Sequence, residues 1–332
     1  MLNATPKISI IIPCLDGLNY VEKLFDALNQ QSFKDFEIIF INSHCSTVDE
    51  TAQKVNLFTE LDIKIFSTKA LLPGDARNLG VSHATASLIT FIDMRTIPHY
   101  DWLESSYNLM EKSGFDIVLG KFTCTTLNTL QEYVKAATFG NSPVNSLPGT
   151  LVTAETFQQV GNFLSEARAG EDEEWLGRVH GGNFSVGLMP RETLTYIGLP
   201  TTLLDLAKKW FSYSIKSAPI NVAKSQKEAY FFLLFLFILY FFFNWNYLLT
   251  SNQWDQSPYF IPHINKIMWS IFLFIYVILR GLVIPIHKGV KKSFLFPLNW
   301  LMLSVVSMII DFSKLPGRVM GYLYYLKSKF QN

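Results

Sequence analysis

The sequence predicts an α/β domain built on a mostly parallel sheet, followed by a C-terminal part made of transmembrane helices. Short apolar runs alternate with helical patterns along the first 120 residues, which is typical of repeated strand–helix units. From residue 229 onward the composition changes to Phe, Leu, Ile, Tyr and Trp, and charged residues become rare. The formal net charge of +1 is therefore a sum over one part expected in water and one expected in lipid. The sequence contains no basic tract of the kind that binds nucleic acid.

The elements of the domain follow from these patterns in chain order. The apolar run at residues 8–12 is continuous, as expected for a strand that is buried on both faces of a parallel sheet. Further strands are expected at residues 36–41, 63–66, 88–93 and 116–120. Helices are expected at residues 21–28, from the capping box of Thr47 and Glu50, from about residue 75, and at residues 102–110. Such strands are joined by right-handed crossovers.

Polar side chains follow three of these strands at the point where each strand ends. Asp16 follows the first strand, Asn42 and Ser43 follow the second, and Asp93 follows the fourth. Ligands of open parallel sheets bind at the carboxyl ends of the strands. We therefore expect a ligand site at this edge, within a first domain of residues 1–200.

Residues 201–226 are expected to form an amphipathic helix and a linker. Apolar side chains of residues 203–215 gather on one side of the expected helix, and lysines lie elsewhere. This pattern fits a helix that lies in the lipid interface. It fits an ordinary surface helix packed on the domain equally well.

The remaining residues, 227–332, are expected to form a membrane domain. Its apolar stretches are residues 229–249, 267–286 and 294–311. The first two are long enough to cross the hydrocarbon core, although Arg280 in the second would have to reach the headgroups. The third is short and contains Pro297 and Asn299, so the sequence leaves its crossing undecided.

Charge near the second span predicts the orientation of the chain. Lys288, Lys291 and Lys292 follow this span, and such positive loops face the cytoplasm. The chain is therefore expected to be an integral membrane protein with a cytoplasmic N-terminal domain. The same rule opposes a crossing of the third stretch, because the basic tail would then lie outside; a re-entrant or interfacial segment would keep it inside.

Several sequence segments resemble those of one enzyme family, in the family's order. They are residues 9–13 with 31–39, then 76–80, 91–93, 101–103 and 170–175. Together they are similar to the family-2 glycosyltransferases, including bacterial membrane-anchored enzymes of lipid-linked glycan or exopolysaccharide assembly in the cell envelope. The resemblance implies a GT-A fold, a UDP- or GDP-linked sugar as donor, and inversion at the anomeric carbon.

The acidic cluster at residues 171–174 is the expected catalytic motif. Inverting transfer needs a carboxylate that takes the proton of the attacking acceptor hydroxyl. Asp172 matches the aspartate of the family's Glu-Asp motif, and the resemblance therefore implies that it is the base. Glu171, Trp175 and Arg178 are expected on the acceptor side or in support of the base. Without the resemblance, a solvated acidic helix start explains the cluster as well.

The expected donor-binding residues lie earlier in the chain. They are Pro13, Asp16, Asn42, Ser43, Arg77, Asn78, Asp93 and Arg95. Asn42 and Ser43 stand where the family usually has aspartates that contact the nucleoside, and an asparagine still offers a donor and an acceptor. Arg77 and Asn78 open a helix near the expected donor phosphates, although a helix-surface salt bridge explains Arg77 equally well.

The segment Asp93-Met94-Arg95 departs from the family pattern. Relatives usually carry a second acidic residue where Arg95 stands, and the pair helps to hold Mg²⁺ or Mn²⁺ against the diphosphate. One carboxylate is a poor site for a cation that prefers several oxygen ligands. Three interpretations stay open: Asp93 binds the metal with water and the diphosphate, Arg95 replaces the cation, or catalysis has been lost.

The predicted function is transfer of one sugar to a lipid-linked or membrane-proximal acceptor at the cytoplasmic face. Residues 206–210 lack the glutamine and the arginine of the Gln-x-x-Arg-Trp motif in processive synthases, which argues against chain extrusion. Membrane anchoring raises the effective concentration of a lipid acceptor. The alternative is a non-catalytic subunit that binds nucleotide sugars or acts as a scaffold in a glycan assembly complex.

Overall fold

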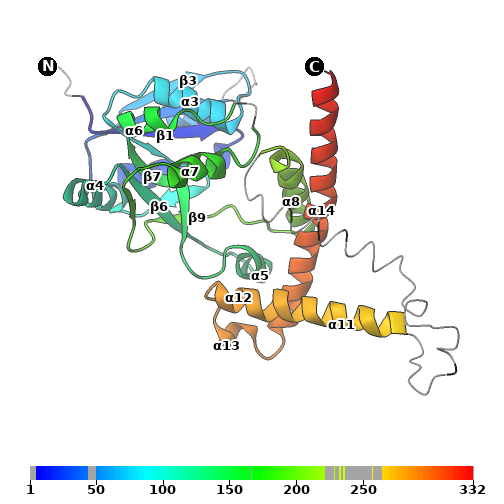
Figure 1. Ribbon diagram of the computed structural model, residues 1–332. Coiled ribbons are helices and arrows are strands. Elements are labelled where there is room, and N and C mark those ends of the chain that lie inside the picture. The colour runs from blue at the N-terminus through cyan, green and yellow to red at the C-terminus, as the bar shows by residue number, and fades with distance from the viewer. Residues whose placement is uncertain are drawn as a thin grey trace.

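The first 200 residues form a sheet with helices on both of its faces (Figure 1). The computed structural model describes residues 5–43, 50–165, 167–220 and 264–331, and the single positions 228, 232, 235 and 256. Apart from the single positions 232 and 235, the predicted span at residues 229–249 lies outside the described residues, and so does Thr47 of the capping box.

The strands form one mixed sheet in the order β3-β2-β1-β4-β7-β6-β9-β5, with β8 paired to β6. Their bounds are β1 Ile8–Cys14, β2 Phe36–Asn42, β3 Ile63–Ser67, β4 Leu88–Phe91, β5 Thr96–Pro98, β6 Ile117–Cys124, β7 Val144–Thr153, β8 Val186–Leu188 and β9 Leu194–Tyr196. β1 pairs in parallel with β2 and β4, and β2 pairs in parallel with β3. The five predicted strands are therefore confirmed.

The antiparallel strand β7 was not predicted from the sequence. It lies between β4 and β6 and pairs antiparallel with both. Its sequence contains Pro148 and Gly149, which are depleted in strands, and Gly149 adopts a φ of 83°. Local sequence reasoning favours a loop at such a segment, and only its pairing with two neighbours makes it a strand.

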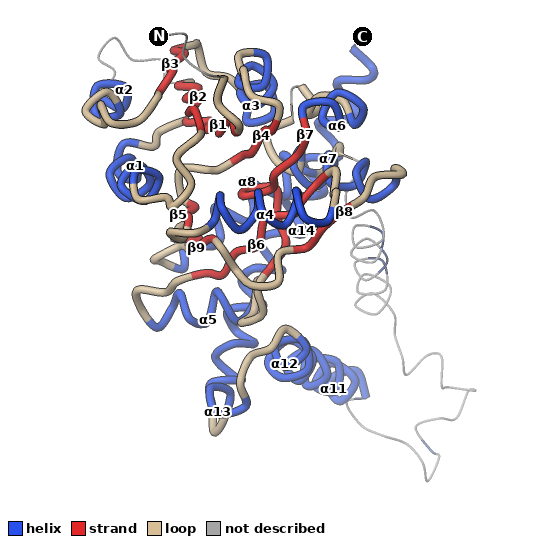
Figure 2. The backbone as a smooth tube through the Cα atoms, turned by 90° about the vertical axis from the view of Figure 1, so that its left-hand side faces the viewer, coloured by secondary structure: helices blue, strands red, loops and turns tan. Residues whose placement is uncertain are grey.

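Helices cover both faces of the sheet and extend beyond it. In the first 220 residues they are η1 Leu18–Tyr20, α1 Val21–Asn29, α2 Glu50–Val55, α3 Pro73–Ser82, α4 Trp102–Ser113, α5 Thr129–Thr138, α6 Ala154–Val160, α7 Glu171–Gly181 and α8 Leu203–Ser217. The later ones are α11 Ile264–Ile278, the π-helix η3 Leu279–Val283, α12 Ile284–His287, α13 Lys292–Leu295 and α14 Asn299–Gln331. Helices α1 and α4 pack on one face of the sheet, and α3, α6 and α7 pack on the other (Figure 2).

Side-chain alternation in β1 explains how one strand serves two cores. Ile8, Ile10 and Ile12 pack with the apolar faces of α1 and α4. Ile11 points the other way, into the core with α3, α6 and α7. Because both faces are covered, the strand is apolar throughout, which is why it reads as a continuous run.

Two C-terminal helices are long and apolar enough to cross a membrane. They are the continuous helical stretch Ile267–His287 and the segment Asn299–Lys327 within α14. The first exposes apolar side chains nearly all round, whereas α14 buries one side against the rest of the chain. Length and composition make these helices candidates for membrane spans, and this by itself is weak support for membrane attachment.

Helix α14 packs closely along α8. Hypothetical Cβ atoms at Gly317 and Gly321 would lie 2.6 Å and 2.3 Å from the carbonyl oxygens of Phe211 and Ile215. Only glycine permits such an approach, and a Gly-x-x-x-Gly spacing is typical of close helix pairs. The amphipathic helix predicted at residues 203–215 is thus a real helix with one side packed on α14.

Arg280 has a different environment from the one the sequence suggested. Instead of reaching toward headgroups, its Nε lies 2.8 Å from Oδ2 of Asp311, and its Nη2 lies 3.1 Å from Oδ1. The Tyr276 hydroxyl donates to the same carboxylate at 3.0 Å. Asp311 comes from α14, so the charge of Arg280 is neutralised by the neighbouring helix.

Candidate functional site

The carboxyl ends of β1, β2 and β4 bring the predicted polar residues to one edge of the sheet. Cys14 pairs with Asn42 in the sheet, and the Ser43 amide donates to the Cys14 carbonyl at 2.9 Å. Asn42 and Ser43 are buried, and Asp16 is exposed with a φ of 55°. Aspartate tolerates this left-handed conformation better than most residues. The sharp turn after β1 therefore leaves Asp16 at the rim, with Asn42 and Ser43 beneath it.

Arg77 connects two acidic segments that lie far apart in the sequence. Its Nη1 donates to Oε1 of Glu171 at 2.7 Å, and its Nη2 donates to Oδ1 of Asp93 at 2.9 Å. Arg77 is 4% exposed and Glu171 is equally buried, whereas Asp93 is half-exposed. Helix α3 thus supplies one guanidinium that joins the end of β4 to the start of α7. Both terminal nitrogens of Arg77 are engaged in these ion pairs, and its expected contact with the donor phosphates stays a prediction.

The pKa values of this cluster reflect burial and mutual charge. Burial opposes the charge of Arg77, but the carboxylates of Asp93, Glu171 and Asp172 outweigh it and raise the arginine's pKa. Burial also raises the pKa of Glu171; Arg77 opposes this shift and Asp172 adds to it. The cluster therefore stays tightly held around a permanent positive charge.

Asp172 begins α7 beside Glu171 and is half-buried rather than enclosed. The preceding Gly170 has a φ of 88°, which lets the chain turn sharply into the helix. On the other side, the Tyr213 hydroxyl of α8 bonds Glu173. Burial, followed by the charges of Glu173 and its acidic neighbours, raises the pKa of Tyr213. Glu171 thus pairs with Arg77, Glu173 with Tyr213 and Glu174 with Arg178. Within the described part of the chain, Asp172 forms no hydrogen bond to Arg77 or to α8.

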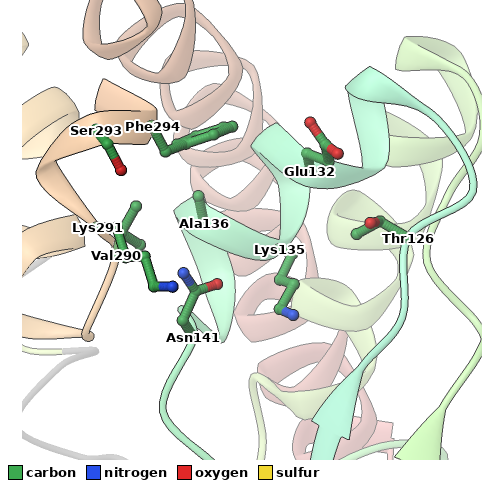
Figure 3. A pocket seen from close by; sticks show the side chains of 9 residues that line it. All are labelled: Thr126, Glu132, Lys135, Ala136, Asn141, Val290, Lys291, Ser293 and Phe294. Atoms are coloured by element: carbon green, nitrogen blue, oxygen red, sulfur yellow. The ribbon is translucent and has the colours of Figure 1, made fainter. Parts of the chain in front are cut away.

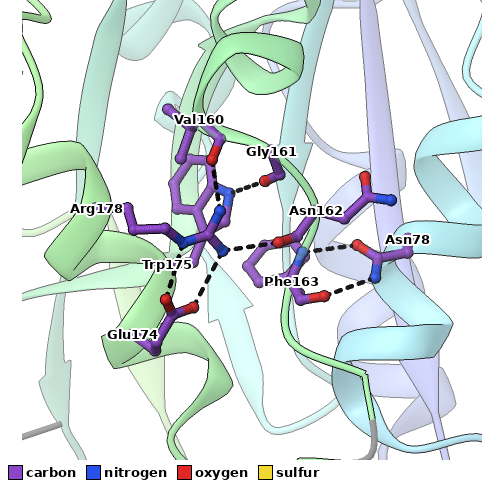
Figure 4. Close-up of polar contacts among 8 residues, drawn as sticks. All are labelled: Asn78, Val160, Gly161, Asn162, Phe163, Glu174, Trp175 and Arg178. Atoms are coloured by element: carbon purple, nitrogen blue, oxygen red, sulfur yellow. Dashed lines mark hydrogen bonds and ion pairs between the residues drawn. The ribbon is translucent and has the colours of Figure 1, made fainter. Parts of the chain in front are cut away.

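Three of the predicted residues form the frame behind this site (Figure 4). Asn78 exchanges two hydrogen bonds of 2.9 Å with the backbone of Phe163, so its amide holds a loop instead of facing a donor. Trp175 is fully buried, and its Nε1 donates to the Gly161 carbonyl at 2.9 Å. Of the two roles expected for Trp175, its burial favours support of the base over contact with the acceptor.

Arg178 belongs to the same frame. It forms a salt bridge with Glu174 one turn earlier in α7, with Nε 2.9 Å from Oε1. Its two terminal nitrogens donate to the carbonyl oxygens of Val160 and Asn162, at 2.5 Å and 2.7 Å (Figure 4). Arg178 therefore fixes the loop after α6 against α7, which is a supporting role.

Arg95 lies at the same edge of the sheet as Asp16. Its guanidinium carbon is 5.4 Å from the ring centroid of Tyr20, which belongs to η1 after β1. This is a cation–π contact at an exposed side chain. A Cβ at Gly198 would lie 2.6 Å from Cδ of Arg95, so the chain beyond β9 restricts the arginine from the other side.

A divalent cation would find one protein ligand here. The second oxygen of Asp93 has no partner among the described residues, and these residues include no cluster of three or more His, Cys, Asp or Glu side chains placed to hold a metal. Mg²⁺ keeps octahedral coordination, using one or two carboxylates plus phosphate oxygens and water. A cation therefore fits Asp93 only together with a bound diphosphate.

Sequence reasoning missed Tyr20 and Tyr213. Tyr20 follows the first strand among ordinary loop residues, and Tyr213 lies in a helix that the sequence separates from the domain. Neither carries a motif. Only the tertiary structure brings Tyr20 under Arg95 and Tyr213 against the acidic turn.

Comparison with known proteins agrees with this architecture. Residues 9–162 match the family model described as glycosyl transferase family 2. An uncharacterized glycosyltransferase of Rickettsia conorii is 28% identical over 182 residues, which cover 52% of this chain and 30% of that protein. The glycosyltransferase AglE of Haloferax volcanii is 23% identical over 199 residues, covering 56% of this chain and 65% of AglE. The chain therefore matches less than two thirds of the length of either relative.

A solved structure shows the same fold over nearly the whole chain. The mannosyltransferase PcManGT from Pyrobaculum calidifontis, in complex with GDP-Man and Mn²⁺, superposes with a TM-score of 0.53 at 13% identity. The match covers 94% of this chain and 88% of that chain. The sheet is thus GT-A-like, and residues 9–162 are a domain of glycosyl transferase family 2.

Proposed function

We propose that the protein transfers one hexose from a nucleotide-sugar donor to a lipid-linked or membrane-proximal acceptor, with inversion at the anomeric carbon. The observation that carries the proposal is the ion-paired link of Arg77 to both Asp93 and Glu171. It holds the donor edge of the sheet and the acidic turn of α7 as one unit. Asp172 is then held in place by its covalent neighbour Glu171.

The donor would bind across the ends of β1, β2 and β4. Asn42 and Ser43 suit a nucleoside, because a buried amide and hydroxyl can bond to a base or ribose. Asp93 and Arg95 suit the diphosphate, either through a cation held by Asp93 or through the arginine itself. The mannosyltransferase of similar fold was solved with GDP-Man and Mn²⁺, which supports a nucleotide sugar as the donor class.

Asp172 would act as the general base. It would accept the proton of the acceptor hydroxyl as the oxygen attacks the anomeric carbon, while the bond to the nucleoside diphosphate breaks on the opposite face. A bound cation would neutralise charge on the departing diphosphate. Glu171 does not compete for the proton, since Arg77 engages it and it is buried.

The membrane helices would bring this site to a lipid-borne acceptor. Lys288, Lys291 and Lys292 follow the apolar helix Ile267–His287, and the positive-inside rule supports a cytoplasmic N-terminal domain. An acceptor confined to the same membrane needs no binding from bulk solution, which favours transfer at the membrane face.

Membranes containing the full chain, incubated with radiolabelled UDP- and GDP-sugars, test the proposal. We expect label in the lipid-extractable fraction, and we expect Asp172→Asn to lower the rate by about a hundredfold or more. Glu173→Gln removes the neighbouring charge and is the matched control, which should keep most activity. Absence of transfer and of hydrolysis with every donor, while a nucleotide sugar still binds, would instead support the non-catalytic alternative.

The same assay shows whether a metal cation held by Asp93 or the guanidinium of Arg95 neutralises the diphosphate. Loss of activity with EDTA, restored by added Mn²⁺ or Mg²⁺, is the expected result if Asp93 holds a cation. Activity that survives EDTA but is lost in Arg95→Ala would assign the charge of the cation to the arginine.

A further inference from the structure

A pocket lies away from the proposed donor site, where α5 meets the loop between α12 and α13 (Figure 3). It encloses about 350 Å³ and shares no residue with the donor edge. Its lining residues are Thr126, Glu132, Lys135, Ala136, Asn141, Val290, Lys291, Ser293 and Phe294. This volume is at the lower end of the range for small-molecule sites.

The pocket is rigid because its two walls are bonded together. The backbone amides of Asn141 and Ser142 donate to the Lys288 carbonyl at 3.0 Å and 3.3 Å, and Nζ of Lys288 donates to the Thr138 carbonyl at 2.5 Å. A Cβ at Gly140, which has a φ of 76°, would lie 2.3 Å from the Lys288 carbonyl oxygen. The end of α5 and the loop at residues 288–290 therefore form one surface.

The charged side chains that line the pocket are two lysines and one carboxylate. Lys135 is half-buried and Lys291 is exposed, and neither ammonium group forms a hydrogen bond or a salt bridge within the described part of the chain. The amide of Asn141 and the hydroxyls of Thr126 and Ser293 add hydrogen-bond donors. A single carboxylate, Glu132, lies on α5 three residues before Lys135 (Figure 3). Such a set suits a phosphate group, whose oxygens accept charge-assisted hydrogen bonds.

The pocket also lies next to the end of a candidate span. The apolar helix Ile267–His287 ends three residues before Val290, which lines the pocket. Beyond the pocket, Phe296 and Leu298 expose 52% and 64% of their surfaces. Apolar side chains that flank a basic loop at the end of a span are typical of the headgroup level of a bilayer.

We propose that this pocket binds the phosphate headgroup of an anionic membrane phospholipid. Lys135 and Lys291 pair with the phosphate, Ser293 and Asn141 donate hydrogen bonds, and the acyl chains continue past Phe294 into the bilayer. Basic pockets beside membrane helices on the cytoplasmic side bind anionic headgroups in this way. The inference rests on the proposed membrane attachment but not on the proposed sugar transfer.

The test uses the full chain in a neutral maltoside detergent and measures its melting temperature. Short-chain phosphatidylglycerol is titrated into the wild type, and phosphatidylcholine of the same chain length and inorganic phosphate are titrated separately. We expect stabilisation by phosphatidylglycerol alone. Equal effects of both lipids, or an inorganic phosphate effect as large as that of phosphatidylglycerol, would overturn the proposal.

Neighbouring lysines provide the matched variants. Lys291→Gln and Lys292→Gln remove the same charge from the same exposed loop, but only Lys291 lines the pocket. We expect Lys291→Gln and Lys135→Gln to weaken the apparent lipid affinity about tenfold, and Lys292→Gln to leave it nearly unchanged. If Lys291→Gln and Lys292→Gln lowered the lipid affinity equally, the lipid would be attracted by the general positive charge of this segment. That result would overturn the proposal of a headgroup site in the pocket. The readout is binding, so a failure to transfer sugar does not affect it.

Discussion

At the scale of single residues, two buried charged side chains organise the domain. Arg77 joins Asp93 to Glu171. Glu37 of β2 bonds Ser9 of β1, Lys64 of β3 and Thr85 in the loop before β4. Both are almost fully excluded from water. A buried charge is tolerated only when its partners satisfy it, so these residues are sensitive positions even though neither lies on the surface.

Removing the Arg77 guanidinium should destabilise the domain strongly. Arg77→Met leaves Glu171 buried without its cation, and we expect a loss of about 3 to 5 kcal/mol in unfolding free energy. Chemical denaturation of the detergent-solubilised chain measures this. Adding Glu171→Gln to Arg77→Met should recover part of the loss. An unchanged midpoint in Arg77→Met would contradict the network.

Glu37 should make the fold sensitive to acid. Its carboxylate accepts hydrogen bonds from Ser9, Thr85 and Lys64 at 2.5–2.8 Å. Burial alone would raise the pKa of Glu37, but the bonds from Lys64, Ser9 and Thr85 outweigh burial and lower it. A carboxylate whose pKa is lowered by folding stabilises the fold above its unfolded pKa, about 4.3 for glutamate, and this stabilisation is lost as the pH falls through the folded pKa.

Glu37→Gln should therefore cost about 2 kcal/mol at neutral pH. The difference between wild type and variant should narrow as the pH falls below about 4.3, the unfolded value, and through the lower folded pKa, because the wild-type carboxylate is then becoming protonated. Melting curves of both proteins across this pH range give the comparison. A constant difference would mean that the charge of Glu37 is not what stabilises the fold.

At the scale of secondary-structure elements, helix α8 is the connection between the domain and the C-terminal helices. One side of α8 contacts the acidic turn through Tyr213, and the other packs on α14 at Gly317 and Gly321. The amphipathic pattern of α8 was compatible with a lipid interface or with a protein surface. The structure gives it a protein partner on one side, and its exposed Leu203 and Leu204 leave the lipid interface as a proposal for its N-terminal end.

Substitution of Gly321 should disrupt this contact. A Cβ at this position would lie 2.3 Å from the backbone oxygen of Ile215, which cannot move like a side chain. We expect Gly321→Leu to destabilise the chain by about 1 to 3 kcal/mol, seen as a lower melting temperature. Met320→Leu, on the exposed side of α14, is the control and should have no measurable effect.

At the scale of the whole molecule, α11 and α14 run in different directions. Figures 1 and 2 agree that α14 runs alongside the domain while α11 crosses its direction steeply. Spanning helices tilt only moderately from the membrane normal, so two helices that cross steeply do not span the same bilayer together. The nearly all-round apolar surface of Ile267–His287 favours that helix as the span. The one-sided exposure of α14 favours a position along the interface.

Together with the crossing expected at residues 229–249, a single further span at Ile267–His287 returns the chain to its first side, so the end of α14 should lie on the same side of the membrane as the N-terminal domain. Epitope tags added before Met1 and after Asn332 can be compared for protease accessibility in sealed, inside-out vesicles. We expect both tags to be cleaved, because α14 packs on α8 at Gly317 and Gly321 and so stays on the side of the domain. Protection of the C-terminal tag alone would place α14 across the membrane.

The sequence by itself determined the elements with strong periodicity and the motifs with strong local chemistry. Sequence alone predicted the apolar runs of β1, β2 and β4, the apolar faces of α1 and α4, and the family resemblance. Each of these features depends on residues that are close together in the chain. The sheet edge that gathers Asp16, Asn42 and Asp93 was predictable too, since parallel strands end together.

What only the tertiary structure decided concerns partners far apart in the chain. Arg77 pairs with Glu171 across 94 positions, Arg280 pairs with Asp311 on another helix, and β7 becomes a strand only between β4 and β6. A buried charged or polar group needs a hydrogen-bond or ion-pair partner, and that partner is a residue that lies beside it in space. Local pattern carries no information on that choice, and so the roles of Arg77, Asn78, Trp175 and Arg178 became visible only in the folded chain.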